Sequence, residues 1–395
     1  MTTDKHNKRP NVPPLRFPEF TEPWETAKLG DMTVNFSKRN KDEIEYPMYS
    51  VTNNRGFIPQ SEQFEDREMV SSDIKSYKII TKGDFAYNPA RINVGSIAKY
   101  NGDNDCMISS LYVAFRAKEQ INAEWLMQLL KTPKMNFYYN LNAEGGVRMY
   151  LFYPNFERIR TSYPSLNEQR KVAQFLDLLD HRIAVQSGLI EKLESLISGI
   201  TLSIMKSDDC ESIRLSELLT ERNEVNTAQY EVYSVSVSQG VVNQVEYLGR
   251  SFAAKDTSNY NVVHYGDIVY TKSPTGDFPY GIVKRSNQAK PVAVSPLYGV
   301  YIPASNDIGC FLHYYFCNAV STKNYLHKLI QKGAKNTINI TNQRFLENTI
   351  KVPNAEKLAI VVKLLNQLSV KKQRAEDLLA LYRKQKQHLL SQMFI

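Results

Sequence analysis

The chain has 395 residues, of which 42% are hydrophobic and 23% charged, as in globular proteins with room for two or three domains. The net charge of +8 permits a polyanionic partner without requiring one. No apolar run approaches the ~18 residues of a membrane span, and the polar first residues do not resemble a signal peptide. Four scattered cysteines suit a reducing compartment, so we expect a cytoplasmic protein.

Several stretches of the first half recur, with substitutions, in the second half. Residues 46–60 read YPMYSVTNNRGFIPQ and residues 230–244 read YEVYSVSVSQGVVNQ. In the same way KGDFAYN (82–88) corresponds to YGDIVYT (265–271). The shared positions are largely Gly, Asp, Tyr and apolar residues, which fix turns and cores, while the segments between them differ. This pattern predicts two domains, residues 14–164 and 206–353, with one scaffold and different loops. A duplication without division of function is the alternative.

A long helix is predicted to follow the first domain, over residues 165–205. Ser165 and Glu168 form a capping-box signature directly after Pro164. Apolar residues then recur at alternating spacings of four and three, which is the heptad pattern of a coiled coil. The members of this seam include Leu176, Leu179, Ile183, Ile190, Leu193 and Ile197.

A second helix of the same kind is predicted over residues 354–395. Its seam includes Leu365, Leu368, Leu379 and Leu389, with Lys372 and Lys386 at two further heptad positions. Two narrow apolar stripes of matching length favour a pair of helices that bind each other. We therefore expect an α+β fold of two tandem pseudo-symmetric domains, each followed by a long helix, with the helices paired as an antiparallel coiled coil. The alternative is that each helix packs only on its own domain.

The sequence contains none of the common catalytic signatures. It has no GxxxxGK[ST] phosphate-binding loop and no strand-bounded GxGxxG dinucleotide motif. Its six histidines do not pair at metal-ligand spacing and the cysteines form no CxxC, so no metal site is expected. The chain is therefore predicted to be a binding protein and not an enzyme.

The best candidates for DNA contacts lie in loops that differ between the two repeats. The stretch KLIQKGAKNTINITNQR (328–344) contains basic residues, no acidic residue and interleaved Asn and Gln. Asn and Gln can read adenine edges, while Lys and Arg bind phosphates or guanine. For any single residue, an ordinary solvated loop is the alternative. The predicted contacts are Asn54, Arg55, Arg91, Asn93, Arg148, Tyr150, Lys272, Ser273, Thr275, Lys332, Lys335, Asn336, Asn339, Asn342 and Arg344.

With this organisation, the chain resembles the specificity subunit of a type I restriction-modification system. The local resemblance rests on PPLRFPEFTEPWETAKLGD (13–31) and GGVRMYLFYPNFERIRTSYPSLNEQRKVAQFLDLLD (145–180). It also rests on KLESLISGITLSIM (192–205), which LYRKQKQHLLSQMF (381–394) mirrors. The second helix departs from the family pattern, because NAEKLAI after Pro353 lacks a counterpart of the Glu168–Gln169 pair.

The resemblance implies a function and a set of partners. Each target-recognition domain would read one half of a split site on double-stranded DNA, and the helices would space the domains and dock two methyltransferase subunits. Restriction and motor subunits would join through the complex. Adenine methylation with S-adenosylmethionine and DNA cleavage with ATP and Mg are expected in those partners, with no cofactor in this chain. A methyltransferase-only complex, or a coiled-coil scaffold that binds no DNA, are the alternatives.

Overall fold

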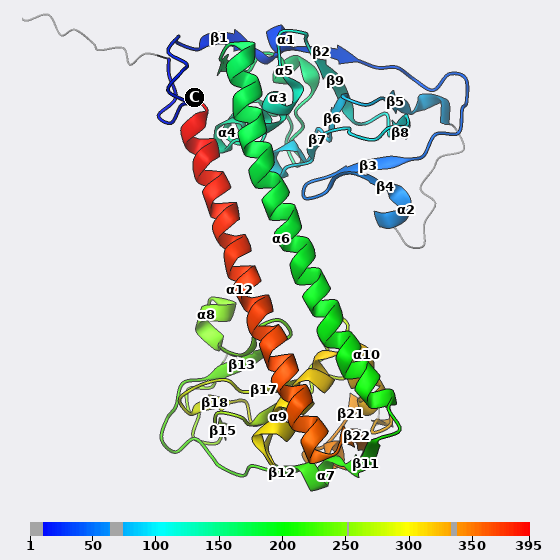
Figure 1. Ribbon diagram of the computed structural model, residues 1–395, viewed down its shortest axis with the longest axis vertical. Coiled ribbons are helices and arrows are strands. Elements are labelled where there is room, and N and C mark those ends of the chain that lie inside the picture. Colours follow the sequence, from blue (N-terminus) through cyan, green and yellow to red (C-terminus); the bar gives the residue numbers. More distant parts are fainter. Residues whose placement is uncertain (1–10, 64–73, 251–252, 333–337) are drawn as a thin grey trace, which may run out of the picture. The chain divides into compact units, whose positions relative to one another are not determined.

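The computed structural model describes residues 11–63, 74–250, 253–332 and 338–395. The chain divides into two compact units, Met1–Gln186 with Leu378–Ile395, and Ser187–Asp377. The unit boundary cuts both long helices, so each unit contains a globular domain together with part of α6 and part of α12 (Figure 1). In the described parts of the chain, no helix has the length and apolar character that crossing a membrane requires.

The first unit is built from short strands and helices around a four-stranded antiparallel sheet in the order β2-β9-β6-β7. Two-stranded pairs β1-β10, β3-β4 and β5-β8 flank it. The elements are β1 (Glu25–Lys28), α1 (Leu29–Met32), β2 (Thr33–Phe36), β3 (Tyr49–Thr52), β4 (Gly56–Pro59), α2 (Gln60–Gln63), η1 (Ile74–Ser76), β5 (Lys78–Ile80), β6 (Phe85–Tyr87), η2 (Ile92–Val94), β7 (Ile97–Lys99), β8 (Cys106–Ile108), β9 (Val113–Ala117), α3 (Ala123–Leu130), α4 (Pro133–Asn142), α5 (Tyr153–Phe156), β10 (Arg160–Tyr163) and α6 (Leu166–Lys206).

The second unit repeats the strand topology of the first. Its four-stranded sheet has the order β12-β19-β16-β17, and the pairs β11-β22, β13-β14 and β15-β18 correspond to the three pairs of the first unit. The elements are β11 (Cys210–Arg214), α7 (Leu215–Leu218), β12 (Leu219–Glu221), β13 (Tyr233–Ser236), β14 (Gly240–Asn243), α8 (Gln244–Leu248), β15 (Asn261–Val263), β16 (Ile268–Thr271), β17 (Ile282–Arg285), β18 (Val292–Val294), β19 (Gly299–Pro303), α9 (Asn306–Cys317), α10 (Ala319–His327), β20 (Gln331–Lys332), β21 (Ile338–Asn339), α11 (Asn342–Phe345), β22 (Thr349–Pro353) and α12 (Ala355–Met393). The expectation of two tandem α+β domains is confirmed.

The short helices begin where the sequence supplies a capping side chain. Asn122 accepts a hydrogen bond from the main-chain N–H of Trp125 at the start of α3, and Thr132 does the same for α4, where Pro133 occupies the first turn. In the second unit Ser305 caps α9 and Asn318 caps α10. The paired helices α3–α4 and α9–α10 therefore have the same construction, although their capping residues differ.

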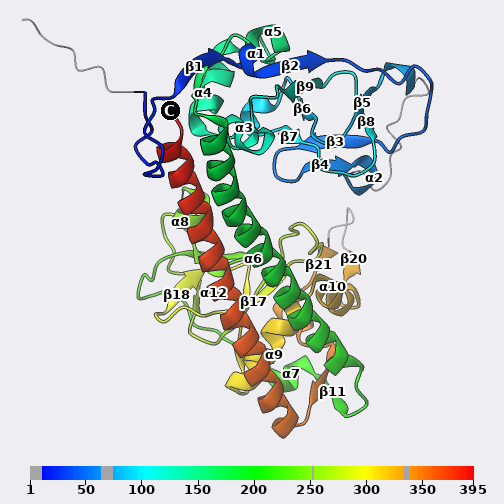
Figure 2. The ribbon, with the colours of Figure 1, turned by 45° about the horizontal axis from the view of Figure 1, so that its top comes forward.

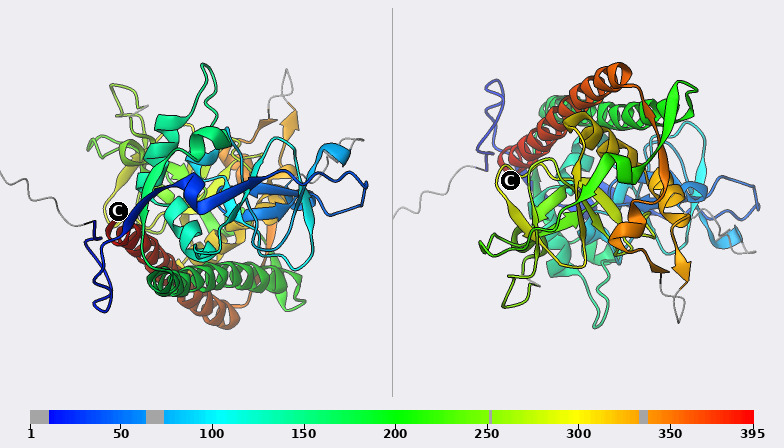
Figure 3. Two further views of the ribbon diagram at one scale, coloured as in Figure 1. Left: turned by 90° about the horizontal axis from the view of Figure 1, so that it is seen from above. Right: turned by 90° about the horizontal axis from the view of Figure 1, so that it is seen from below.

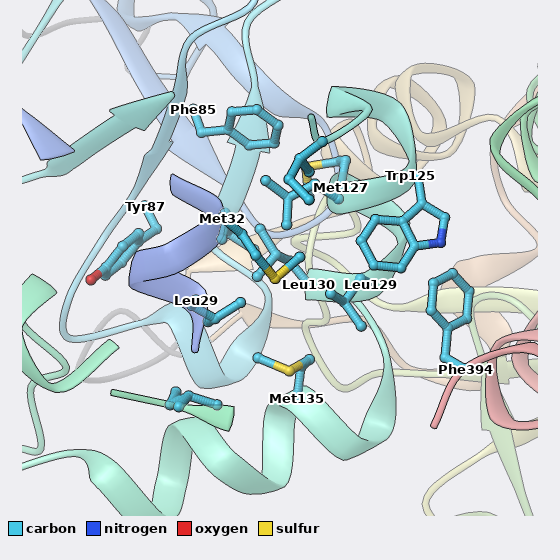
Figure 4. Packing of buried hydrophobic residues seen from close by; sticks show 14 of the residues in the cluster. Leu29, Met32, Phe85, Tyr87, Trp125, Met127, Leu129, Leu130, Met135 and Phe394 are labelled. Atoms are coloured by element: carbon cyan, nitrogen blue, oxygen red, sulfur yellow. The ribbon is translucent and has the colours of Figure 1, made fainter. Parts of the chain in front are cut away.

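The core of the first unit includes the end of the chain. Aromatic residues of the sheet and the apolar face of α3 form its centre (Figure 4). Phe394, just after α12, packs between Trp24 and Trp125, with ring centroids 6.3 and 5.9 Å away. The main-chain N–H of Leu15 also donates to the carbonyl oxygen of Gln392, 3.0 Å away. The last residues of the chain thus belong to the first domain by packing and by hydrogen bonding.

The helices α6 and α12 pair in the antiparallel sense within each unit (Figure 2). In the first unit Asp180 of α6 contacts Lys386 of α12. In the second unit Glu194 contacts Lys372, and Asp209 beyond the end of α6 contacts Lys357 near the start of α12. All of the predicted seam residues are buried or half-buried. The antiparallel pairing expected from the heptads is confirmed.

The predicted capping box at the start of α6 is only half formed. The main-chain N–H of Glu168 lies 3.5 Å from Oγ of Ser165, as the signature requires. The Glu168 carboxylate, however, accepts two hydrogen bonds of 2.7 Å from Arg16 and one of 3.2 Å from Nε1 of Trp24. Glu168 binds Arg16 and not the main chain of Ser165 because a buried carboxylate is stabilised far more by an arginine than by a main-chain N–H group.

A buried aspartate holds the same turn in each domain. Asp84 accepts a hydrogen bond from the main-chain N–H of Thr81 and pairs with Arg116. Asp267 accepts one from the main-chain N–H of His264, 2.8 Å away, and pairs with Arg222. The glycine before each aspartate has a φ of 92°, a left-handed conformation that a residue with a Cβ rarely adopts. The repeated Gly-Asp pair is thus a structural device of both sheets.

Candidate nucleic-acid interface

A short hairpin lies between α4 and α5 of the first domain. The main-chain groups of Glu144 and Tyr150 exchange two hydrogen bonds, of 2.8 and 2.7 Å. Gly145 is required at the turn, since its φ is 136° and a Cβ there would lie 2.1 Å from the carbonyl oxygen of Arg148. The side chains of Val147 and Arg148 are exposed. Figure 3 shows this hairpin, coloured between cyan and green, projecting from its domain.

The loop around η2 lies against the base of this hairpin. The main-chain N–H of Leu151 donates to the carbonyl oxygen of Pro89, 3.0 Å away. Nδ2 of Asn93 donates to Oδ1 of Asn140 on α4, also at 3.0 Å, and Arg91 is exposed. Two of the predicted DNA-contacting loops of the first domain, which are about fifty residues apart in sequence, therefore form one surface.

The turn between β3 and β4 joins this surface from the other side. Oγ of Ser96, at the end of the η2 loop, donates to the carbonyl oxygen of Val51, 2.6 Å away. Arg55 follows in the turn, and its guanidinium lies 2.7 Å from Oε2 of Glu62. Because both side chains of this ion pair are more than two-fifths exposed, the pair contributes little to stability and leaves Arg55 accessible to an anion.

A groove of about 460 Å³ runs beside the β3–β4 turn. It is lined by Asn54 and Arg55 together with Lys99 of β7 and Lys131, which follows α3. Burial, together with the neighbouring Lys386 ammonium, lowers the pKa of Lys131. Lys99 lies in a strand and Lys131 in the short turn between α3 and α4, so neither emerges from the sequence as a candidate. Only the packing of α3 beside β7 brings them to the groove.

In the second domain, the loop from Thr271 to Gly281 carries three of the predicted contacts. The main-chain groups of Thr275 and Phe278 exchange hydrogen bonds of 3.1 and 3.0 Å, which closes the loop into a tight turn. Ser273 and Thr275 are exposed, whereas Lys272 is half-buried. Burial lowers the pKa of Lys272, and the nearby Glu221 carboxylate opposes that effect. Ser273 and Thr275 are therefore the more accessible side chains of this loop.

Two further predicted contacts have protein partners. Nδ2 of Asn342 donates to Oε1 of Glu221, 2.7 Å away. Arg344 donates from Nε to the carbonyl oxygen of Leu329 and from a terminal nitrogen to Glu347, both at 2.9 Å. The bond to Leu329 links α11 to the residues that follow α10, and the bond to Glu221 links it to β12. A role of Asn342 or Arg344 in DNA contact stays a prediction, and it would require these bonds to be shared or exchanged.

The hairpin β20–β21 is the counterpart of the hairpin in the first domain. Its main chain pairs Gln331 with Asn339 and Lys332 with Ile338 (Figure 2). The predicted contacts Lys332 and Asn339 thus lie on facing strands. Lys335 and Asn336 lie outside the described residues. The two domains therefore place a hairpin at the same point of the fold, between the paired short helices and the strand that precedes the long helix.

The fold defines a class of protein in which two similar α+β domains are joined by an antiparallel pair of helices. Residues 21–195 match the family model described as the type I restriction modification DNA specificity domain. A segment of 206 residues is 24% identical to a putative type I restriction enzyme MjaX specificity subunit of Methanocaldococcus jannaschii. That match covers 49% of this chain and 48% of the relative, so the chain spans about half the length of the curated relative that it matches.

Solved structures extend the likeness to nearly the whole chain. The S subunit of a type I restriction-modification system from M. genitalium superposes with a TM-score of 0.59 at 12% identity, over 97% of this chain and 99% of that one. A chain from a structural study of complex assembly and conformational transition of the type I R-M system gives a TM-score of 0.52 at 13% identity. The match covers 93% of this chain and 96% of that one. At these identities the likeness establishes the fold. With the family match, it confirms the resemblance visible in the sequence.

Proposed function

We propose that this chain is the DNA-recognition subunit of a type I restriction-modification complex, and that each domain reads one half of a bipartite site. The observation that carries the proposal is the family match of residues 21–195 to a DNA specificity domain, combined with the same strand order in the second domain. A duplicated scaffold with different loops suits two readers of different sequences.

The surface of the first domain supports a reading role. Its three converging segments present Arg55, Arg91 and Arg148 as exposed residues. Arginine can bind a phosphate or donate two hydrogen bonds to guanine in the major groove. Asn54 and Asn93 lie in the same segments, and amide side chains pair in a similar manner with adenine. The mixture of cations and amides is what base reading combined with phosphate positioning requires.

The outer faces of the long helices support a docking role. Several apolar residues are exposed there at helical spacing, namely Phe175, Leu178, Val185 and Leu196 on α6, and Ile360, Leu364, Val370, Leu378 and Leu381 on α12. Isolated exposed apolar residues are ordinary, but Phe175–Leu178, Ile360–Leu364 and Leu378–Leu381 are neighbours three or four residues apart, and such neighbours form an apolar surface that a partner can cover. We propose that these surfaces dock two methyltransferase subunits, through which restriction subunits join. Methyl transfer from S-adenosylmethionine and the use of ATP and Mg would occur in those partners.

The proposal is tested by mapping adenine methylation in a host that carries this gene with its methyltransferase partner. A host with the partner gene alone is the control. We expect a bipartite methylated site that appears only when both genes are present. A matching gel-shift experiment would use the purified complex and duplexes with or without that site. Methylation that does not depend on this chain, or equal binding to all duplexes, would contradict the proposal.

A further inference from the structure

A cluster of titratable side chains surrounds Cys317, apart from the candidate interface. Cys317 is the last residue of α9 and is solvent-exposed. His313 lies one turn earlier on the same helix, with Nε2 3.7 Å from the Cys317 sulfur. Lys284 of β17 approaches from the sheet, with Nζ 3.3 Å from the same sulfur. Two nitrogen donors from two different elements therefore converge on one sulfur atom.

Lys284 is the unusual member of this cluster. Its residue is only 5% exposed, and within the described parts of the chain the Cys317 sulfur is the one hydrogen-bond partner of Nζ. An ammonium group that is buried without an anion is strongly unfavourable. A neutral thiol is a weak acceptor, whereas a thiolate carries the compensating charge. The burial of Lys284 therefore favours the ionised form of Cys317.

The hydrogen bonding of His313 also favours the ionised form of Cys317. The main-chain N–H of Arg285 donates to Nδ1 of His313, 3.3 Å away. Because Nδ1 is an acceptor in this bond, the ring hydrogen belongs on Nε2, which faces the sulfur. The imidazole thus donates to Cys317 even when it is neutral. Among the described residues, Tyr314 also interacts with Cys317.

Because of these effects, the thiol pKa of Cys317 differs from that of a second cysteine, Cys106. Desolvation of the sulfur opposes ionisation at Cys317, but its interactions with His313 and Lys284 outweigh that effect and lower the pKa of the thiol to about 6. At Cys106 burial is the main influence, and it raises the pKa of that thiol to about 12. The reactive form is the thiolate, so these two cysteines should differ widely in reactivity at neutral pH.

We propose that Cys317, paired with Lys284 and His313, is a reactive thiol site that takes up low-molecular-weight disulfides. The thiolate sulfur attacks one sulfur of the disulfide, a new S–S bond forms, and the other half leaves as a thiolate that takes its proton from water. An external thiol reverses the exchange by the same chemistry. The exposed position of Cys317 at the end of α9 gives the disulfide access.

The direct test is the pH dependence of alkylation in the full-length chain. Brief pulses of iodoacetamide between pH 5 and 9, with peptide mass spectrometry, would follow each cysteine separately. We expect half-maximal labelling of Cys317 near pH 6. At that pH the rate should exceed that of an unfolded cysteine peptide with a pKa of about 8.5 by about tenfold, since the larger thiolate fraction outweighs the lower intrinsic nucleophilicity. Incubation with oxidised glutathione should then modify Cys317 ahead of Cys106, reversibly with dithiothreitol.

Two variants distinguish an effect of Lys284 on the reactivity of Cys317 from the effect of solvent exposure alone. Lys284→Met removes the cation at similar size and should move the labelling midpoint of Cys317 upward, whereas Lys323→Met, at an exposed lysine of α10, should leave it unchanged. Thermal unfolding would establish that both variants are folded. A wild-type midpoint above pH 8, which needs no variant, would overturn the proposal. So would a folded Lys284→Met protein whose Cys317 titrates as in the wild type.

Discussion

Lys386 of α12 and Asp180 of α6 form an ion pair of 2.5 Å at a heptad position where a coiled coil usually carries an apolar residue. Lys372 repeats the arrangement two heptads earlier, where it binds Glu194 at 2.9 Å. Asp180 and Glu194 are likewise two heptads apart on α6. The pairing register is therefore the same in both units, and the two charged interruptions of the seam are the contacts that specify it.

This register defines where the helices can be lengthened together. Seven residues inserted after Leu193 in α6 and after Lys372 in α12 lie on the same side of the Glu194–Lys372 pair and preserve the heptads. The insertion adds about 10 Å of helix, which corresponds to about three base pairs of DNA. If the helices space the two readers, methylome mapping should find both half-sites unchanged and the spacer longer by about three.

One control for the insertion is a single insertion in α6, which breaks the pairing register and should abolish activity. Three base pairs also rotate one half-site by about 100° around the DNA axis, so reduced activity is expected in the double insertion. An active double-insertion protein that retains the original spacer length would show that the helices do not set the distance.

The buried pair between Arg16 and Glu168 is predicted to be a main determinant of the stability of the first unit. Glu168 is 1% exposed, and its carboxylate has no second cation among its described partners. Arg16→Met keeps the aliphatic stem but leaves the charge of Glu168 uncompensated, so the free energy of unfolding should fall by about 3 kcal/mol. The matched control, Arg55→Met, breaks an exposed pair and should change it by less than about 1 kcal/mol. Denaturant titration of both proteins would distinguish these cases.

The two buried aspartates yield a test of the pseudo-symmetry. In the first domain Arg116 on β9 binds Asp84, and its guanidinium stacks 4.7 Å above the ring of Phe36. In the second domain the arginine is Arg222, which directly follows β12 and occupies the position equivalent to Phe36, while Ile302 occupies the position equivalent to Arg116. The two domains therefore neutralise the same carboxylate from different positions of the fold.

Arg116→Ile alone should destabilise the first unit by about 1–2 kcal/mol, because the buried Asp84 is left without its cation while the half-exposed arginine is partly screened by water. The double variant Phe36→Arg, Arg116→Ile copies the arrangement of the second domain and should recover most of that loss. Thermal unfolding of the two proteins and the wild type measures the recovery. A double variant that is no more stable than the single one would mean that the two sheets are not interchangeable at this site.

Local periodicity explains why so much of this fold was predictable. The heptad spacing of residues such as Leu176 and Leu365 and the repeated Gly-Asp turns are contained within short stretches of sequence, so the domains and paired helices could be predicted from them. The Arg16–Glu168 pair and the Lys284–Cys317 contact join residues that are far apart in the chain. Such contacts depend on the packing of separate elements, which the spacing of residues does not encode. The loop residues could be selected by composition, but their grouping into one surface follows only from the fold.

Base readout and phosphate binding should respond differently to mutation. Arg148 lies at the tip of the hairpin of the first domain, so Arg148→Ala should cost about 1–3 kcal/mol at particular base pairs if it contacts a base. Lys332→Ala should weaken binding to all sequences and reduce the salt dependence by about one counterion. Binding of both variant complexes to cognate and scrambled duplexes, over a range of salt concentrations, checks the assignment. An equal loss on both duplexes for Arg148→Ala would refute its role in reading.

The most direct test of the two-reader account is to exchange one domain. Residues 14–163 would be replaced by the corresponding domain of a relative with a known site, while α6, the second domain and α12 are retained. Each domain has its own sheet, and the residues of α6 and of the C-terminal end of α12 that complete the core of the first domain are retained, so the exchanged chain should fold and assemble with the same methyltransferase. Methylation mapping by long-read sequencing should then show one half-site changed to that of the donor and the other half-site unaltered. If both half-sites changed, or if neither did, the assignment of one half-site to each domain would be wrong.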